Sequence, residues 1–123
     1  MASFEYIFYQ DKKGKYWLTK TNITFAQNEN PTGERIILTL PKLVDATGGT
    51  VNYNIHDCAF YGNDSIGELR IPSTISEVRS NAFKRSNIHT IYFLSEFPPT
   101  VYTDTFADLN VYNNASLSSV EKQ

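Results

Sequence analysis

The chain lacks the sequence features of disulfide-rich, membrane-spanning and signal-peptide-bearing proteins. Its 123 residues include one cysteine, Cys58, so an internal disulfide framework is excluded, although the compartment stays open. No apolar run reaches the roughly 18 residues of a membrane-spanning helix. The residues after Met1 offer neither the charged start nor the apolar stretch of a signal peptide.

Charge of one sign is not in excess either. The net charge is −2, and 41% hydrophobic and 20% charged residues are ordinary for one folded domain. Phosphate binding needs a concentrated basic surface, so we predict that nucleic acid is not a partner. The basic cluster Lys12–Lys15 is interpreted as a hairpin tip with solvated charges.

A nucleophile site is weakly supported. His56, Asp57 and Cys58 are adjacent, and a pairing of nucleophile and base is conceivable from the residue types alone. Free cysteine is most often a small buried filler, and Cys58 stands directly before an apolar pair. We therefore predict that Cys58 is buried and reacts slowly with thiol reagents, and that the protein is not an enzyme.

Metal and cofactor motifs are also scarce. A site built from His56, Cys58 and Asp64 lacks the paired spacing of zinc motifs. The stretch 63–65 has too few carboxylates for a calcium loop, and Gly48-Gly49 precedes no helical pattern. We predict no metal and no cofactor.

What the chain has instead is a repeat. Two sets of apolar residues recur at one constant interval, namely Phe60, Phe83 and Phe106, and Ile55, Val78 and Val101. A third set, Ile66, Leu69 and Ile71, returns after an interval shorter by one position as Ile88, Ile91 and Phe93. A period of about 23 residues indicates a solenoid, in which each unit buries its apolar side only by stacking on the next.

The repeated residues also carry a family resemblance. Leu69–Phe83, read as L-x-I-P-x-x-I-x-x-V-x-x-x-A-F, resembles the BspA-like class of leucine-rich repeats. Ile55–Gly62 is similar to the I-G-x-x-A-F-x-G element of that class. His56 and Arg79 stand where the family usually has glycine after the second strand. The resemblance is clear over Val51–Tyr112 and looser before it.

From the period and the resemblance we predict a mainly β single domain, residues 1–123, built as a short right-handed leucine-rich-repeat solenoid. Its strands at 38–40, 69–71, 91–93 and 109–111 should stack in a parallel ladder. Phe60, Phe83 and Phe106 should form one interior column.

The two ends should differ from the repeats. Phe4–Tyr9 and Tyr16–Thr19 predict a hairpin and Ile23–Ala26 a third strand, so that residues 1–35 form a β-rich N-terminal cap. Three to four repeats follow over 36–112, with about eight residues inserted at Asp45–Thr50. Residues 113–123 should form a short helical tail, which Asn114 could cap.

A binding surface is expected on the outward side of the ladder, because side chains alternate along a strand. The candidate binding residues, with Arg70 and Tyr92 at their centre, are Thr39, Glu68, Arg70, Thr90, Tyr92, Asn110 and Tyr112. An ordinary solvated sheet face is the simpler interpretation of the same pattern. The loop Asp45–Thr50 and the aromatic Tyr61 are competing candidates.

The resemblance implies the function. BspA-like repeats are common in surface proteins of host-associated anaerobic bacteria, which implies an exported, cell-surface or secreted module whose leader is not part of this sequence. Its partner would be a protein or another extracellular macromolecule, and its role adhesion to host components. A structural spacer of a larger surface assembly is the alternative. The oligomeric state is left open.

Overall fold

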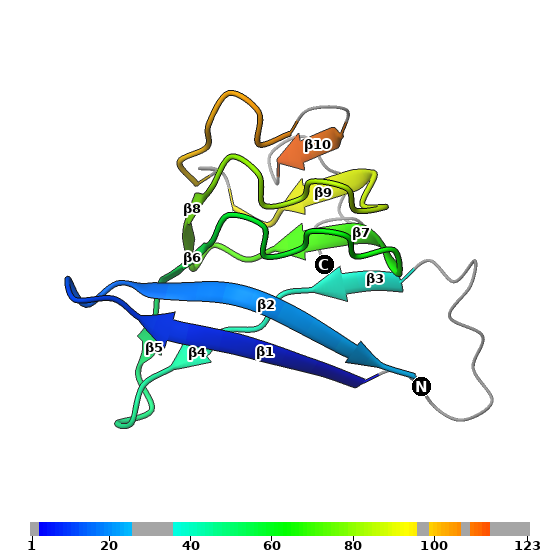
Figure 1. The fold of residues 1–123 in the computed structure, drawn as a ribbon. Coiled ribbons are helices and arrows are strands. Elements are labelled where there is room, and N and C mark those ends of the chain that lie inside the picture. The colour runs from blue at the N-terminus through cyan, green and yellow to red at the C-terminus, as the bar shows by residue number, and fades with distance from the viewer. Residues whose placement is uncertain (1–2, 26–35, 96–98, 107–108, 114–123) are drawn as a thin grey trace.

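The computed structural model describes residues 3–25, 36–95, 99–106 and 109–113. Within them the chain forms ten strands and no helix, arranged as two four-stranded sheets and one two-stranded sheet (Figure 1). The predicted mainly β character is confirmed. The tail predicted to be helical lies outside the described residues, except for Asn113, which ends the last strand.

The first four-stranded sheet, here called the ladder sheet, is entirely parallel. It is formed, in spatial order, by β10 (Asn110–Asn113), β9 (Thr90–Phe93), β7 (Ile66–Ile71) and β3 (Ile36–Thr39). Parallel strands need long crossover connections. Here each crossover passes through the second large sheet or along its edge, and the ladder strands are stacked one above another in Figure 1.

The register of the ladder sheet agrees with the repeat for three strands and differs for the fourth. Leu38 lies opposite Leu69, and Leu69 opposite Ile91; these three side chains are 5%, 0% and 0% exposed. The prediction placed Leu109 beside Ile91, but Val111 lies there. A slip of two residues preserves the alternation of side chains, so the hydrophobic pattern alone does not distinguish the two registers.

The second four-stranded sheet, here called the hairpin sheet, joins the N-terminal hairpin to the repeats. Its order is β1 (Ser3–Gln10), β2 (Tyr16–Thr24), β6 (Tyr53–Ile55) and β8 (Ile75–Val78). β1 and β2 are antiparallel, whereas β2–β6 and β6–β8 are parallel. The hairpin therefore extends the edge of the sheet that the repeats form.

The N-terminal hairpin is longer than predicted. Ile23 and Thr24 continue β2 opposite β1, so the separate third strand predicted at Ile23–Ala26 is wrong; residue 26 lies outside the described part. A register shift between Ile7 and Phe8 accommodates one extra residue, and the hydroxyl of Thr19 donates to the Ile7 carbonyl at 3.0 Å. Such a bulge lets the pair bend and still continue.

The insertion expected at Asp45–Thr50 is the turn of a small hairpin. β4 (Leu43–Val44) and β5 (Thr50–Val51) pair antiparallel around it. Asp45 closes the turn by accepting hydrogen bonds from the hydroxyl and amide of Thr47 and the amide of Gly49. These bonds, the Thr47 hydroxyl first, lower the pKa of the Asp45 carboxyl.

The core lies between the ladder sheet and the hairpin sheet and continues into the turns that join them. Phe83 stacks on Phe60 with ring centroids 5.7 Å apart, and on Phe106 with centroids 6.3 Å apart. The backbones of successive turns are joined as well, since the Phe60 amide donates to the Ala82 carbonyl at 2.8 Å. The predicted column of phenylalanines is confirmed.

The second apolar column is complete at only two of its three positions. Ile55 and Val78 are register partners and are fully buried. Val101, which shares their spacing, is 40% exposed. It follows the single bridge between Glu77 and Thr100 at the edge of the hairpin sheet, where a side chain has a neighbouring strand on one side only.

Cys58 is exposed, so the prediction of a buried thiol is wrong. Its backbone is left-handed, with φ of 62°, and its amide donates to the Asn81 carbonyl at 3.2 Å. Burial begins one residue later, at Ala59, as it does at Ala82 after the exposed Asn81. The turn therefore directs the Cys58 side chain away from the core, which the pattern of apolar residues in the sequence did not indicate.

A second left-handed position recurs with the repeat. Gly62 has φ of 71°, and Arg85, which takes the same place in the next repeat, has φ of 57°. Glycine adopts this region without penalty, whereas a side chain with a Cβ is strained there.

We expect Arg85→Gly to raise the free energy of unfolding by about 0.5–1 kcal/mol, because relief of the strain exceeds the added freedom of the unfolded chain. Gly62→Ala should lower it by about 1 kcal/mol, although no atom crowds the new methyl group. Urea denaturation measures both changes. Arg85→Ala keeps the strain and serves as the control; a gain equal to that of Arg85→Gly would show that the side chain, and not the backbone, is responsible.

Candidate binding surfaces

The outward side of the ladder sheet forms the first candidate surface, here called the strand face, with Thr39, Glu68, Arg70 and Tyr92. Thr39, Arg70 and Tyr92 lie side by side on β3, β7 and β9, as the alternation predicted. The Arg70 guanidinium lies 5.3 Å from the centre of the Tyr92 ring, and its Nε is 2.9 Å from a Glu68 carboxylate oxygen. The face therefore presents an arginine fixed between an acid and an aromatic ring.

The other predicted members of the strand face are placed less favourably or differently. Thr90 is only 9% exposed, and its hydroxyl lies 2.7 Å from His89 Nδ1. In the backbone register Asn110 pairs with Thr90 and Tyr112 with Tyr92, whereas the prediction placed Asn110 beside Tyr92. Of these three residues, Thr90 offers little surface to a partner.

The two competing loop candidates are both exposed. Residues 45–50 are exposed throughout, but the Asp45 carboxylate is used inside the turn. Tyr61 is 49% exposed beside Gly62. Neither position brings several aromatic or charged side chains together in the way that the strand face does.

A second surface, which the sequence analysis missed, lies on the outward side of the hairpin sheet. It is here called the aromatic row and consists of Tyr9, His56, Trp17, Arg79 and Tyr102. His56 lies 6.1 Å from Tyr9 and 5.3 Å from Trp17 between ring centroids. The Arg79 guanidinium lies 5.6 Å from the Trp17 ring and 5.5 Å from the Tyr102 ring. Ring contacts thus link all five side chains.

The aromatic row follows from the repeat together with the hairpin. His56, Arg79 and Tyr102 share the spacing of the repeat, and each comes directly after a residue of the column Ile55, Val78 and Val101. Pairing of β2 with β6 then brings Trp17 beside them. The signal in the sequence was the presence of His56 and Arg79 at the two positions where the family usually has glycine.

Carboxylates hold the row in place. Glu77 accepts hydrogen bonds from Arg79, at 3.2 Å, and from the hydroxyl of Tyr102. Burial opposes its ionisation, but these two bonds together keep the pKa of the Glu77 carboxyl below its ordinary value. Asp57 lies 3.6 Å from Arg79 Nε. The arginine is therefore oriented by two acids and two rings.

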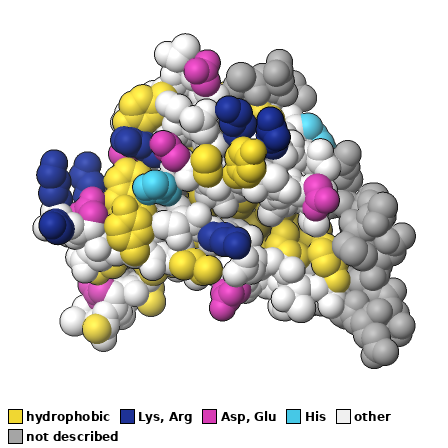
Figure 2. All heavy atoms as spheres, in the orientation of Figure 1, with side chains coloured by type: hydrophobic (Ala, Val, Ile, Leu, Met, Phe, Trp, Pro, Cys, Tyr) yellow, Lys and Arg dark blue, Asp and Glu magenta, His cyan; other side chains and the backbone are white. Residues whose placement is uncertain are grey.

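A cleft of about 570 Å³, here called the hairpin cleft, opens between the β1–β2 turn and the aromatic row. Basic side chains gather over that turn in Figure 2, with hydrophobic side chains and a histidine beside them. The cleft is lined by Asp11, Lys12, Lys13 and Lys15 of the turn and by Trp17, Glu77, Arg79 and Tyr102.

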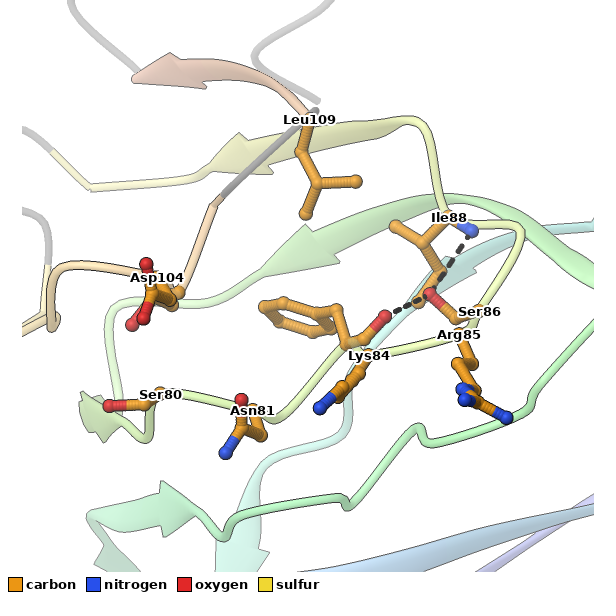
Figure 3. A pocket seen from close by; sticks show the side chains of 10 residues that line it. Ser80, Asn81, Lys84, Arg85, Ser86, Ile88, Asp104 and Leu109 are labelled. Atoms are coloured by element: carbon orange, nitrogen blue, oxygen red, sulfur yellow. Dashed lines mark hydrogen bonds between the residues drawn. The ribbon is translucent and has the colours of Figure 1, made fainter.

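A further hollow of about 450 Å³ lies between the turn after β8 and the segment before β10 (Figure 3). Ser86 is satisfied within the turn: its hydroxyl donates to the Phe83 carbonyl at 2.7 Å and accepts from the Ile88 amide at 3.4 Å. Leu109 lines the hollow and follows directly on residues 107–108, which lie outside the described part of the chain. No site is assigned to it.

Among the described residues, no group of three or more His, Cys, Asp or Glu side chains is placed to hold a metal ion. The same part of the chain contains no helix long and apolar enough to cross a membrane.

Comparison with known proteins decides the family. The family model of the BspA type leucine-rich repeat region (6 copies) matches residues 40–122, which is more than half of the chain. The chain belongs to this family. Proteins with BspA-type repeats are usually found at the cell surface or secreted, and the repeats are generally non-enzymatic modules for protein interaction. No curated protein and no solved structure matched the chain.

Proposed function

We propose that this BspA-type domain binds a protein through its strand face, with Arg70 and Tyr92 at the centre. The observation that carries the proposal is the stacking of Arg70 on Tyr92 across neighbouring parallel strands, with Glu68 fixing the guanidinium. Tyrosine and arginine are enriched in binding hot spots, and an ordered pair loses less entropy on binding. The net charge of −2 favours a protein partner over nucleic acid.

The wider setting of this role is also proposed. Alternation of the chain between the two large sheets, the stacked phenylalanines and the family match support a short right-handed solenoid with residues 1–35 as its cap. The family supports export to the cell surface or medium and adhesion to host components. A spacer role in a larger surface assembly is the second candidate, since Arg70 and Glu68 already satisfy each other.

The first experiment identifies the partner. A photo-crosslinking residue, p-benzoylphenylalanine, replaces the exposed Thr39 next to Arg70, and the protein is irradiated with extracellular host proteins. The same residue in place of the exposed Val44, on the small hairpin, is the control. A protein captured from Thr39 alone supports the strand face. Capture from neither position favours the spacer.

The double variant Arg70→Ala with Tyr92→Ala should then weaken binding of the purified partner by about 2 kcal/mol or more, roughly thirtyfold, because a central hot-spot pair is lost. Surface plasmon resonance measures the affinity, and urea denaturation confirms that the variant is folded. Tyr61→Ala with Arg85→Ala removes the same residue types from exposed turns and should leave the affinity unchanged. Unchanged affinity in the folded Arg70/Tyr92 variant would show that the strand face is only solvated sheet.

A further inference from the structure

We propose that the hairpin cleft is a second binding site, which takes an acidic segment of a protein partner. This proposal rests on the proposed function in one respect, namely that the ligand is a protein. The site itself lies on the hairpin sheet and not on the ladder sheet. Three observations support it. Among the residues that the structure describes, the lysine side chains of the cleft make no hydrogen bond or ion pair, the carboxylates are hydrogen-bonded within the protein, and the aromatic side chains are held in contact with Arg79.

The carboxylates of the cleft are occupied by groups of the protein itself. Asp11 accepts hydrogen bonds from the amides of Lys13 and Lys15, each at 2.9 Å, and from Trp17 Nε1 at 3.0 Å. The bond from Trp17 is the main reason that the pKa of the Asp11 carboxyl is lowered. Glu77 is bound by Arg79 and Tyr102. The hydrogen bonds to both acids therefore come from groups other than a lysine ammonium, and Lys15 adds only a weaker charge attraction to each of them.

The lysine ammonium groups are the charges of the cleft that a ligand can bind. Lys12, Lys13 and Lys15 are exposed, and no hydrogen bond or ion pair of their ammonium groups is found within the described ranges. Even with Asp57 counted, cations outnumber carboxylates around the cleft, on a chain whose net charge is −2. A local positive region of this kind attracts and orients an anionic partner.

The wall of the cleft adds an apolar contact to this charge. Arg79 is held between the rings of Trp17 and Tyr102, and the Tyr102 side chain is 39% exposed. Side chains already held in place lose little entropy when a ligand binds. A volume of about 570 Å³ lies within the range of about 300–1,000 Å³ typical of ligand pockets. The cleft therefore suits a short segment that alternates carboxylates with an aromatic or aliphatic side chain.

A peptide fits these observations better than a nucleic acid or a sulfated glycan. Nucleic-acid backbones need cations along an extended stripe, whereas the free lysines here all belong to one turn. The repeats of this family are protein-interaction modules. The occupant that agrees with both facts is an acidic stretch of protein.

The single tryptophan of the chain provides the readout, because Trp17 lies in the cleft and is 8% exposed. The probe is a tryptophan-free synthetic peptide of glutamates around a central phenylalanine, titrated against the folded domain while Trp17 emission is followed. A saturable change is expected, weakened about tenfold or more between low and high salt. The same peptide with glutamines in place of glutamates should give no saturable change.

Charge reversal locates the site. Lys12→Glu with Lys13→Glu should weaken binding about tenfold or more, since both lysines lie at the cleft and neither ammonium group holds the turn together. Lys20→Glu with Lys42→Glu changes the net charge equally at two exposed positions outside the cleft, and should have little effect. Equal weakening by the two double variants would overturn the site, because the attraction would then be nonspecific.

Two further arms complete the test. A sulfated polysaccharide is added as a competitor, and its concentration is expressed as moles of sulfate. If it displaces the peptide at a lower concentration of sulfate than the concentration of peptide carboxylates, the assignment to a peptide is overturned. Arg70→Ala with Tyr92→Ala should leave peptide binding unchanged. A partner captured at Thr39 without any peptide binding would refute the hairpin cleft alone, whereas peptide binding without capture at Thr39 would refute only the strand face.

Discussion

Phe83→Ala should lower the free energy of unfolding by about 3–5 kcal/mol, the usual cost of removing a large buried side chain. Phe83 is 6% exposed and stacks on both neighbouring phenylalanines, so its loss leaves a cavity in the middle of the column. A small domain is stable by about 5–15 kcal/mol, so the variant should lie close to the limit of folding.

Urea denaturation followed by Trp17 emission measures this effect. Phe106→Ala is the control, because Phe106 stands at the end of the column and is only partly buried. It should cost less than Phe83→Ala, since the site can relax toward solvent. If the two variants lose equal amounts of unfolding free energy, or if Phe83→Ala loses less than about 1 kcal/mol, a cooperative core built on the stacked rings is contradicted.

Tyr53→Ala should also lower the free energy of unfolding by about 3–5 kcal/mol. Tyr53 is fully buried at the junction of the N-terminal hairpin and the repeats. The Tyr53 and Phe8 rings meet in a T-shaped arrangement with centroids 4.9 Å apart, and the Tyr53 hydroxyl donates to the Pro41 carbonyl at 2.7 Å. Burial first, and then the nearby Tyr6 hydroxyl, raise the pKa of Tyr53, so its hydroxyl stays protonated and donating well above neutral pH.

Tyr53→Phe removes the hydroxyl and keeps the ring. It should lower the free energy of unfolding by only about 1 kcal/mol, the net contribution of one hydrogen bond. Hydrogen exchange adds the location: Tyr53→Ala should speed exchange of the β1 and β2 amides more than those of β9, because β2 pairs with β6 directly at Tyr53. Equal acceleration in β2 and β9 would show that the hairpin and the repeats unfold only together.

Much of the fold followed from spacing alone. Leu38, Leu69 and Ile91 lie in register, and the phenylalanines stack, because stacked repeats must present the same apolar residue to the same core. The errors occurred where backbone conformation or position in the sheet mattered more than pattern. Cys58 turned outward through a left-handed φ, and Val101 lies at a sheet edge.

The candidate sites divide in the same way. Contact between Arg70 and Tyr92 was predictable, since alternation and a constant repeat place them on one side of adjacent strands. The aromatic row was not, although three of its members share the repeat spacing. Trp17 reaches Arg79 only through the pairing of β2 with β6, which joins segments that no periodicity relates.

The amino-acid sequence by itself determined the repeat, the parallel ladder and the side of each strand that is buried, because these depend on local alternation and a regular period. Only the tertiary structure decided the register of β10, the exposure of Cys58 and the meeting of Trp17, Arg79 and Tyr102 around the hairpin cleft. Those features depend on single backbone angles and on pairing between distant segments, and many registers and turns satisfy the same hydrophobic pattern.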